Sequence, residues 1–304
     1  MVINEEELVK FLSGKLGRSV ELQHLSNVPA KSVYRMPGAA GEDGEGGGSG
    51  DIFVKCAKLE DCRRSWKYFS VSTLPFVPRA KFFCEWNGCG VMGLGWMKEA
   101  RRIAPEDMSE AQARNLLAAH ARILAEFAEK LPDSATFAKP LPDAAGFYET
   151  VCSFARRHPL FARFLAPLRD IPQAERTYDA SAVATIVNDF HCDNYAFDGD
   201  EVAAVYDFDW MRRGLACEDL TYAFIRRIRK ARLSKEARAR AAARFVQLVR
   251  SSPYPRNEWL CAINICRLDA AAKRLKSHPR LGLVALDVFR RDRGLGELVE
   301  ALRA

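Results

Sequence analysis

The sequence lacks the features that mark a membrane protein or a disulfide-rich secreted protein. No uninterrupted apolar run approaches the roughly 20 residues that a membrane-spanning helix needs. The N-terminal segment MVINEEELVKFL is acidic and does not have the basic-then-apolar order of a signal peptide. Nine scattered cysteines form no Cys-x-x-Cys pair, which argues against a disulfide framework or a zinc ribbon and predicts buried or half-buried thiols. We therefore expect a cytoplasmic protein without a membrane span.

Signatures of nucleic-acid binding are missing as well. The chain has no zinc-finger spacing and no aromatic-rich RNA motif, so we expect no nucleic-acid partner. Its formal net charge is nevertheless +7, and residues 212–250 hold twelve Arg or Lys against three acids. Such a basic cluster is typical of solvated helix faces, but it also fits the attraction of an anionic ligand or surface. The composition leaves both interpretations open.

The chain is long enough and apolar enough for one large or two medium domains. It has 304 residues, of which 48% are hydrophobic and 28% charged, and it contains no internal repeat. Residues 1–96 are predicted to form a small, β-rich N-terminal lobe. Short apolar or alternating runs predict its strands at 20–25, 32–36, 51–57, 80–84 and 90–97, with helices over 4–16 and 59–69. Residues 97–304 are predicted to form a larger, mainly helical C-terminal lobe, so the expected fold class is α+β with two lobes.

Residues 37–50 form a low-complexity insert, PGAAGEDGEGGGSG. It holds seven glycines and three acids and has no large apolar side chain, so it cannot form a core and is expected to be a mobile loop between two strands. A phosphate-binding P-loop would end in Gly-Lys-Ser or Gly-Lys-Thr, and that ending is absent. We therefore expect no direct catalytic role for this insert.

Lys55 is the informative residue of the predicted strand at 51–57. Its neighbours are apolar, and burying an unpaired ammonium group is costly. A lysine in this setting either lies at an exposed edge or has an anionic partner.

The segment 186–220 carries most of the polar chemistry. An apolar run over 182–187 precedes Asp189, and Asn194 follows five residues later. An Asp-Gly turn and a second apolar run then lead to Asp207. Two short β-prone runs joined by a turn predict a hairpin. This hairpin would bring two carboxylates and one amide together, which suits a base beside a hydroxyl and a hard cation such as Mg²⁺.

The order of these parts resembles that of the protein-kinase-like phosphotransferases, which include aminoglycoside phosphotransferases, choline kinases and kinase-like homoserine kinases. The signature of that family is similar to His-Gly-Asp-x-His-x-x-Asn, then apolar-Ile-Asp-Phe, then Asp-Leu-Ala. The matching segments here are VNDFHCDN at 187–194, VYDFDW at 205–210 and EDLT at 218–221. The resemblance covers these central motifs and the order of the lobes. It implies a bilobal protein-kinase-like fold and an enzyme that uses ATP and Mg²⁺.

The resemblance also implies a role for each matching residue. Asp189 would be the catalytic base that orients the acceptor hydroxyl. Asn194 and Asp207 would bind Mg²⁺, and Lys55 would hold the α- and β-phosphates of ATP. Asp219 would brace the catalytic loop from the following helix.

The chain departs from the family pattern in two places. Val187 and Asn188 stand where the family has His-Gly before the catalytic aspartate. The turn over 26–32, which would cover the nucleotide, contains no glycine, and its candidate phosphate-binding side chains are Ser26, Lys31 and Ser32.

Several acids near these motifs have no settled role. Glu60 and Asp61 are the nearest acids that follow Lys55 in the predicted helix, and neither is at an obviously matching distance. Asp209 is either a further metal ligand or a helix N-cap, and Asp193 is typical of a turn residue.

The sequence favours a kinase that phosphorylates a hydroxyl of a small molecule, such as a sugar, an amino sugar, an amino alcohol or an amino acid. The alternative is a non-catalytic, pseudokinase-type module that binds nucleotide or a partner, which the departures above motivate. A metal-dependent hydrolase built on His191 and nearby acids would not need Lys55 or an N-terminal lobe. The basic character of the C-terminal lobe favours a neutral or anionic acceptor. The oligomeric state is not predicted.

Overall fold

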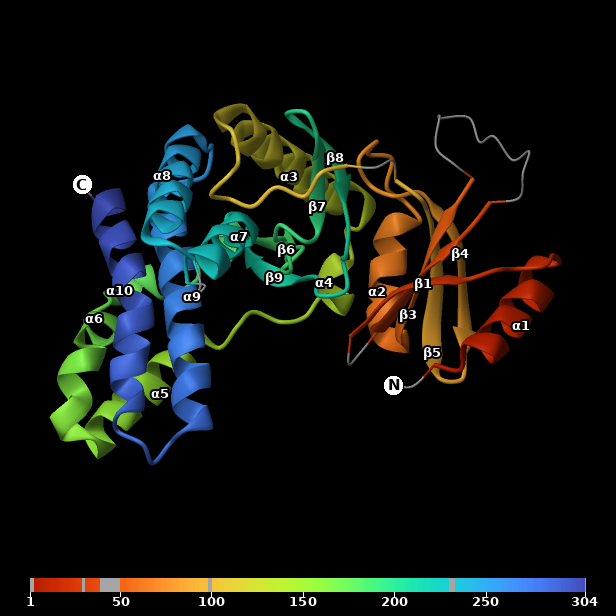
Figure 1. The fold of residues 1–304 in the computed structure, drawn as a ribbon. Helices are drawn as coiled ribbons and strands as arrows, with labels where there is room; N and C mark the ends of the chain where they lie inside the picture. Colours follow the sequence, from red (N-terminus) through yellow and green to blue (C-terminus); the bar gives the residue numbers. More distant parts are fainter. Residues whose placement is uncertain (1–2, 29–30, 39–49, 98–99, 230–232, 304) are drawn as a thin grey trace.

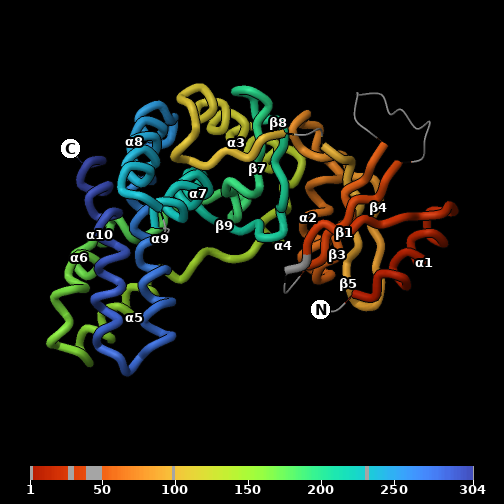
Figure 2. Tube along the Cα trace, viewed as in Figure 1, coloured from red at the N-terminus to blue at the C-terminus, as the bar shows by residue number. Residues whose placement is uncertain are grey.

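The computed structural model describes residues 3–28, 31–38, 50–97, 100–229 and 233–303 (Figure 1). Most of the glycine-rich insert predicted at 37–50 lies outside the described residues, as does the middle of the turn predicted over 26–32. Within the described residues the chain forms a sheet-containing lobe followed by a larger helical lobe, and Figure 2 shows these as two adjacent bodies. The predicted bilobal α+β class is therefore confirmed.

The N-terminal lobe is built on a five-stranded antiparallel sheet with the strand order β1-β2-β3-β5-β4. Helix α2 lies on the side of the sheet that faces the second lobe, and α1 lies on the far side (Figure 1). The elements of this lobe are α1 (Glu5–Leu16), β1 (Gln23–Val28), β2 (Lys31–Met36), β3 (Ile52–Lys58), α2 (Leu59–Phe69), β4 (Ala80–Trp86) and β5 (Cys89–Gly95). The predicted helix at 59–69 is confirmed with the same bounds.

The alternation of side chains along β3 explains how this sheet positions the site. Successive residues of a strand point to opposite faces. Val54 and Cys56 are fully buried in a core cluster that also contains Leu8 and Leu12 of α1. Lys55 therefore points to the other face, toward α2 and the second lobe.

The C-terminal lobe places four short strands among helices. Its elements are α3 (Glu110–Lys130), α4 (Ser134–Phe137), α5 (Ala144–Arg157), α6 (Ala166–Arg169), β6 (Val183–Ile186), β7 (Tyr195–Asp198), β8 (Glu201–Val205), β9 (Arg212–Leu215), α7 (Glu218–Ile228), α8 (Lys235–Ser251), α9 (Arg256–Ser277) and α10 (Val284–Arg303), with 3₁₀ turns at Pro159–Leu165, Gln173–Glu175 and Ala180–Ala182. Helices α8, α9 and α10 gather at the end remote from the sheet (Figure 1).

The strand pairing around the central motifs differs from the predicted hairpin. The hairpin at the Asp198–Gly199 turn joins β7 to β8, and β6 instead pairs with β9, which lies after Asp207 in the chain. The prediction was wrong because it paired the two apolar runs on either side of the turn. The pairing of β6 with β9 joins strands that are distant in the chain. The apolar run before Asp189 gives no local signal of which strand it pairs with.

The two lobes share one hydrophobic core. A single cluster of buried side chains includes Tyr68 of α2 and Met92 of β5 together with Phe208 and Phe224 from the helical lobe. Helix α3 adds a polar clamp, since Glu126 accepts hydrogen bonds from the Tyr68 hydroxyl and from groups just after α2. The position of α2 is thus fixed by the C-terminal lobe as well as by the sheet.

Among the described residues, no helix combines the length and the apolar character needed to cross a bilayer. The nine cysteines are buried or half-buried, as predicted.

Candidate active site

Lys55 is buried between two carboxylates of the other lobe. Its side chain is 5% exposed, and its Nζ lies 2.9 Å from Oδ1 of Asp207 and 2.5 Å from Oδ2 of Asp209. Burial alone would lower the pKa of Lys55, but the charges of Asp209 and Asp207 outweigh it and raise that pKa. The ammonium group is therefore held charged at the junction of the lobes, and the exposed-edge interpretation of this lysine is excluded.

Asp207 is held by cations on both of its oxygens. Oδ1 accepts from Lys55, and Oδ2 accepts from Lys31 of β2. Burial alone would raise the pKa of Asp207, but Lys55 and Lys31 outweigh it and keep that pKa well below its usual range. The backbone of Asp207 has a φ of 64°, a conformation that non-glycine residues rarely adopt and that often occurs at functional sites.

Asp209 is the acidic partner of Lys55 that the sequence did not reveal. Its second oxygen accepts a hydrogen bond from Ser65 of α2, which ties the Asp207–Asp209 segment to the N-terminal lobe. Burial and the nearby Asp207 raise the pKa of Asp209, while Lys55 opposes that shift. Neither Glu60 nor Asp61 reaches Lys55, because both pair with Arg64 on the same helix.

The loop between β6 and β7 presents Asp189 and Asn194 side by side. The Asn194 amide nitrogen donates to the Asp189 backbone oxygen at 2.7 Å and lies 3.3 Å from its Oδ2. The Asp189 side chain is 25% exposed, whereas Asn194 is buried. Asp189 is thus oriented by its neighbour but still open to a small molecule.

His191 supports this loop from within. Its Nε2 lies 3.3 Å from Oδ1 of Asp189, and its Nδ1 accepts the backbone N–H of Asp193 at 3.2 Å. Burial alone would lower the pKa of His191, but the interaction with Asp189 outweighs it and raises that pKa to about 9. His191 therefore helps to hold the Asp189 carboxylate in place.

Asp219 braces the start of the same loop, as predicted. Its two carboxylate oxygens accept the backbone N–H groups of Val187 at 2.8 Å and of Asn188 at 2.5 Å. Its Oδ2 also lies 3.0 Å from Nε2 of the buried His120 of α3. The brace is therefore anchored to α7 and linked to α3.

Asn188, which stands where the family pattern has glycine, adopts a backbone conformation that glycine also adopts. Asn188 has a φ of 69°, in the left-handed region that glycine adopts freely and that asparagine tolerates better than most residues. Its side-chain oxygen accepts from Nε of Arg212 at 2.5 Å. The Asn188 side chain thus ties the start of the loop to β9.

A cleft of about 560 Å³ lies between the sheet and this loop. That volume falls within the roughly 300–1,000 Å³ typical of small-molecule sites. Apolar side chains from β2, β3 and β5 form one wall, and Lys31, Lys55, Asn194 and Asp207 supply polar groups.

The structure gathers most of the predicted site residues at the cleft, with two exceptions, Ser32 and Asp189. Ser26 lines the cleft together with Lys31. Ser32 does not, because it is buried opposite Cys56 on the face of the sheet that packs against α1. Asp189 is not among the residues that line the cleft, although the adjacent Asn194 is.

The donors in the cleft fit a magnesium ion that also binds phosphate. Among the described residues, no group of three or more His, Cys, Asp or Glu is arranged to hold a metal by itself. Mg²⁺ is usually bound through one or two carboxylates plus substrate phosphates and water. The Asp207 carboxylate and the side-chain oxygen of Asn194 are hard ligands of that kind.

Comparison with solved structures gives similarity over nearly the whole chain. A spectinomycin phosphotransferase determined with ADP and spectinomycin matches with a TM-score of 0.58 at 12% identity, covering 100% of this chain and 99% of that chain. A macrolide 2'-phosphotransferase from Brachybacterium faecium, determined as the apoenzyme, matches with a TM-score of 0.55 at 12% identity, covering 97% and 98%. A thermostable mutant of an aminoglycoside phosphotransferase, determined with ADP and hygromycin B, matches with a TM-score of 0.54 at 16% identity, covering 96% and 98%. These likenesses show the fold.

The sequence itself identifies the family. None of the curated proteins compared with the chain matches it significantly. The profile of the phosphotransferase enzyme family, in contrast, matches residues 75–257, which is more than half of the chain and includes Asp189, Asn194 and Asp207. The chain therefore belongs to the phosphotransferase enzyme family.

Proposed function

We propose that this protein is a kinase that transfers the γ-phosphate of ATP, in the presence of Mg²⁺, to a hydroxyl of a small molecule. Sugars, amino sugars, amino alcohols and amino acids are the candidate acceptors. The observation that carries the proposal is the buried contact of Lys55 with Asp207, which joins the sheet to the segment between β8 and β9 at one cleft. The neighbouring structures determined with ADP support a nucleotide in such a cleft.

The residues of the cleft divide into groups that bind phosphate and groups that bind metal. Lys55 and Lys31 supply the positive charges for the ATP phosphates, and Ser26 lies at the same rim. Asp207 and Asn194 would hold Mg²⁺, which supplies charge neutralisation on the phosphoryl group during transfer. Lys31 now donates to Oδ2 of Asp207, and a metal held by Asp207 would compete with Lys31 for this carboxylate.

Asp189 is placed to orient the acceptor. Phosphoryl transfer leaves little covalent work to the protein, so positioning and charge dominate. The Asp189 carboxylate is accessible, is fixed by Asn194 and His191, and carries a lone pair for the acceptor O–H. As the general base it accepts that proton while the phosphoryl group is transferred.

The test is transfer of labelled phosphate from ATP by the purified full chain to a panel of hydroxyl compounds. Asp189→Asn is expected to lower kcat by about 10²–10⁴, the usual contribution of a positioned base, with nucleotide binding retained. Asp198→Asn, an exposed change in the β7–β8 turn, is the matched control. Unchanged transfer in Asp189→Asn would refute the assignment of the base. Nucleotide binding without transfer to any acceptor would favour the non-catalytic module.

A further inference from the structure

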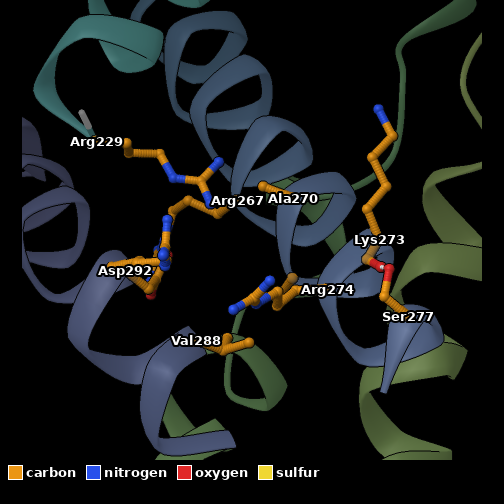
Figure 3. A pocket seen from close by; sticks show the side chains of 10 residues that line it. Arg229, Arg267, Ala270, Lys273, Arg274, Ser277, Val288 and Asp292 are labelled. Carbon is orange, nitrogen blue, oxygen red and sulfur yellow. Dashed lines mark hydrogen bonds and ion pairs between the residues drawn. The ribbon is translucent and has the colours of Figure 1, made fainter. Parts of the chain in front are cut away.

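A second cavity, separate from the cleft, lies in the C-terminal lobe between the end of α7 and the helices α9 and α10 (Figure 3). Its volume is about 260 Å³. This is just below the roughly 300–1,000 Å³ of sites that enclose a drug-sized ligand. The cavity therefore suits one ionic group or a small anion better than a whole substrate.

The lining of this cavity is strongly cationic. Five basic side chains line it: Arg229, Arg267, Lys273, Arg274 and Arg291. Among the described residues, Asp292 is the one carboxylate in the lining. Two further carboxylates lie beside the cavity. Asp269 pairs with Lys273, and Asp287 is shared by Arg274 and Arg291. Within the part of the chain that the structure describes, these three acids leave two of the five positive charges around the cavity without a counter-charge.

Among the described residues, Arg229 has no ion-pair partner, unlike the other four cations around the cavity. Its Nε is buried and has no hydrogen-bond partner among the described residues. Burial lowers the pKa of Arg229, and Asp292 only partly opposes that shift. A buried charge without a paired group is costly, so an anion that filled this place would offset the cost.

The neighbouring Arg267 gives the cavity a rigid wall. It binds Asp292 through two hydrogen bonds of 2.9 and 2.7 Å, and its Nη1 donates to Asn264 at 2.8 Å. Figure 3 shows Arg229, Arg267 and Asp292 gathered on one side, whereas Lys273 extends away from them. The charged groups around Arg229 are therefore held in place before any ligand arrives, which lowers the cost of binding.

One face of α7 leads from the catalytic loop to this cavity. Tyr222, Arg226 and Arg229 are spaced by four and three residues, so they lie on the same side of the helix. Nη1 of Arg226 lies 3.7 Å from Oδ1 of Asp189. Arg229 follows about 4.5 Å further along the helix axis.

Tyr222 lies beside Arg226 on this face of the helix. The guanidinium carbon of Arg226 is 5.9 Å from the centroid of the Tyr222 ring. A molecule with its hydroxyl at Asp189 could extend along Tyr222 and Arg226 toward the basic cavity.

We propose that this cavity binds an anionic group, a phosphate or a carboxylate, carried by the acceptor whose hydroxyl lies at Asp189. The link to an acceptor rests on the proposed function, but binding of an anion in the cavity does not depend on phosphate transfer. The proposal restricts the acceptor to molecules that carry a hydroxyl and, a few bonds away, a phosphate or a carboxylate.

The first test is calorimetric titration of the full chain with inorganic phosphate. Arg229→Gln is expected to weaken binding about 10- to 100-fold, since it removes a hydrogen bond from a charged group. Arg274→Gln should also weaken it, and Arg293→Gln, whose side chain is 73% exposed on α10, should not. The melting temperature of Arg229→Gln should stay equal or rise, because a buried uncompensated charge is lost. Equal phosphate affinity in wild type and Arg229→Gln, or none in wild type, would overturn the proposal.

The second test separates the acceptor from a free anion. Transfer rates are compared for a hexose and its 6-phosphate, and for an amino alcohol and the matching hydroxy amino acid. We expect the anionic member to be preferred, phosphate to compete with it, and Arg229→Gln to raise its KM at unchanged kcat. Phosphate binding that depends on Arg229 but does not compete with the acceptor would assign the cavity to a free anion and overturn the link to the acceptor. If phosphate binding depends on Arg229 and no acceptor is phosphorylated, the anion site stands and the proposed function fails.

Discussion

The clamp at Glu126 gives a quantitative test of how the lobes are joined. Its Oε2 accepts from the Tyr68 hydroxyl at 2.8 Å and from the Ser72 hydroxyl at 2.6 Å. Its Oε1 accepts from the Thr73 backbone N–H at 2.8 Å and from Lys130 at 2.9 Å. All of these donors face a carboxylate that is only 5% exposed. Glu126→Gln keeps the shape of the side chain but replaces one acceptor oxygen with a donor.

The magnitude follows from the pKa of Glu126. Burial would raise this pKa, but Lys130 and the other hydrogen bonds outweigh it and lower it from 4.5 to about 2. One unit corresponds to about 1.4 kcal/mol, so the ionised form contributes about 2–3 kcal/mol, allowing for solvent around Lys130. Because the folded pKa is lowered, this stability is fully present above pH 4.5 and is lost as the pH falls toward 2.

The assay is urea unfolding at pH 7 and at pH 3. Glu126→Gln should lower the free energy of unfolding by about 2–3 kcal/mol at pH 7 and by clearly less at pH 3, where the wild type has lost part of the same contribution. Glu129→Gln, an exposed change on the same helix, is the control and should have little effect. An equal loss at both pH values, or none at pH 7, would refute this account of the clamp.

Two further predictions concern the catalytic loop and Lys55. Asn188→Ala should destabilise the protein by about 1–2 kcal/mol more than Asn188→Gly in thermal or urea unfolding. Both changes remove the hydrogen bond to Arg212, but only alanine is strained at positive φ. Equal losses of stability in the two variants would contradict this argument. In steady-state kinetics, Asp209→Asn should raise the KM for ATP about tenfold, because Lys55 loses one charged hydrogen bond. An unchanged KM would show that Asp209 does not position Lys55.

Local patterns predicted most elements of the N-terminal lobe, although the strand predicted at 20–25 lies at Gln23–Val28 (β1). The α2 helix and the strand around Lys55 follow from hydrophobic periodicity and from the turn signals between them. The order of the lobes and the positions of Asp189, Asn194 and Asp207 followed from short motifs in which the residues are close in the chain. The expectation that these residues meet Lys55, more than a hundred residues away in the chain, rested on the resemblance. The structure shows a direct contact between Lys55 and Asp207.

Nonlocal partners could not be predicted in the same way. The pairing of β6 with β9 depends on which strand reaches it in space, and no turn signal records that choice. The sequence left Asp209 as either a metal ligand or a helix N-cap. Its contacts with Lys55 and Ser65 could not be predicted, because they are made only when the N-terminal lobe packs against the other lobe. Ser32 was a candidate by its place in a turn, but the alternation of β2 directs it to the opposite face.

The most direct test of the central claim is binding of AMP-PNP with Mg²⁺, measured by calorimetry on the wild type and on Asp207→Asn. If Lys55, Asn194 and Asp207 form one nucleotide–metal site, the wild type should bind the complex more tightly with Mg²⁺ than without it. Asp207→Asn should weaken binding by about 10- to 100-fold and remove the effect of Mg²⁺, since a charged metal ligand is lost. Equal binding by the two proteins, or no binding by the wild type, would contradict the account.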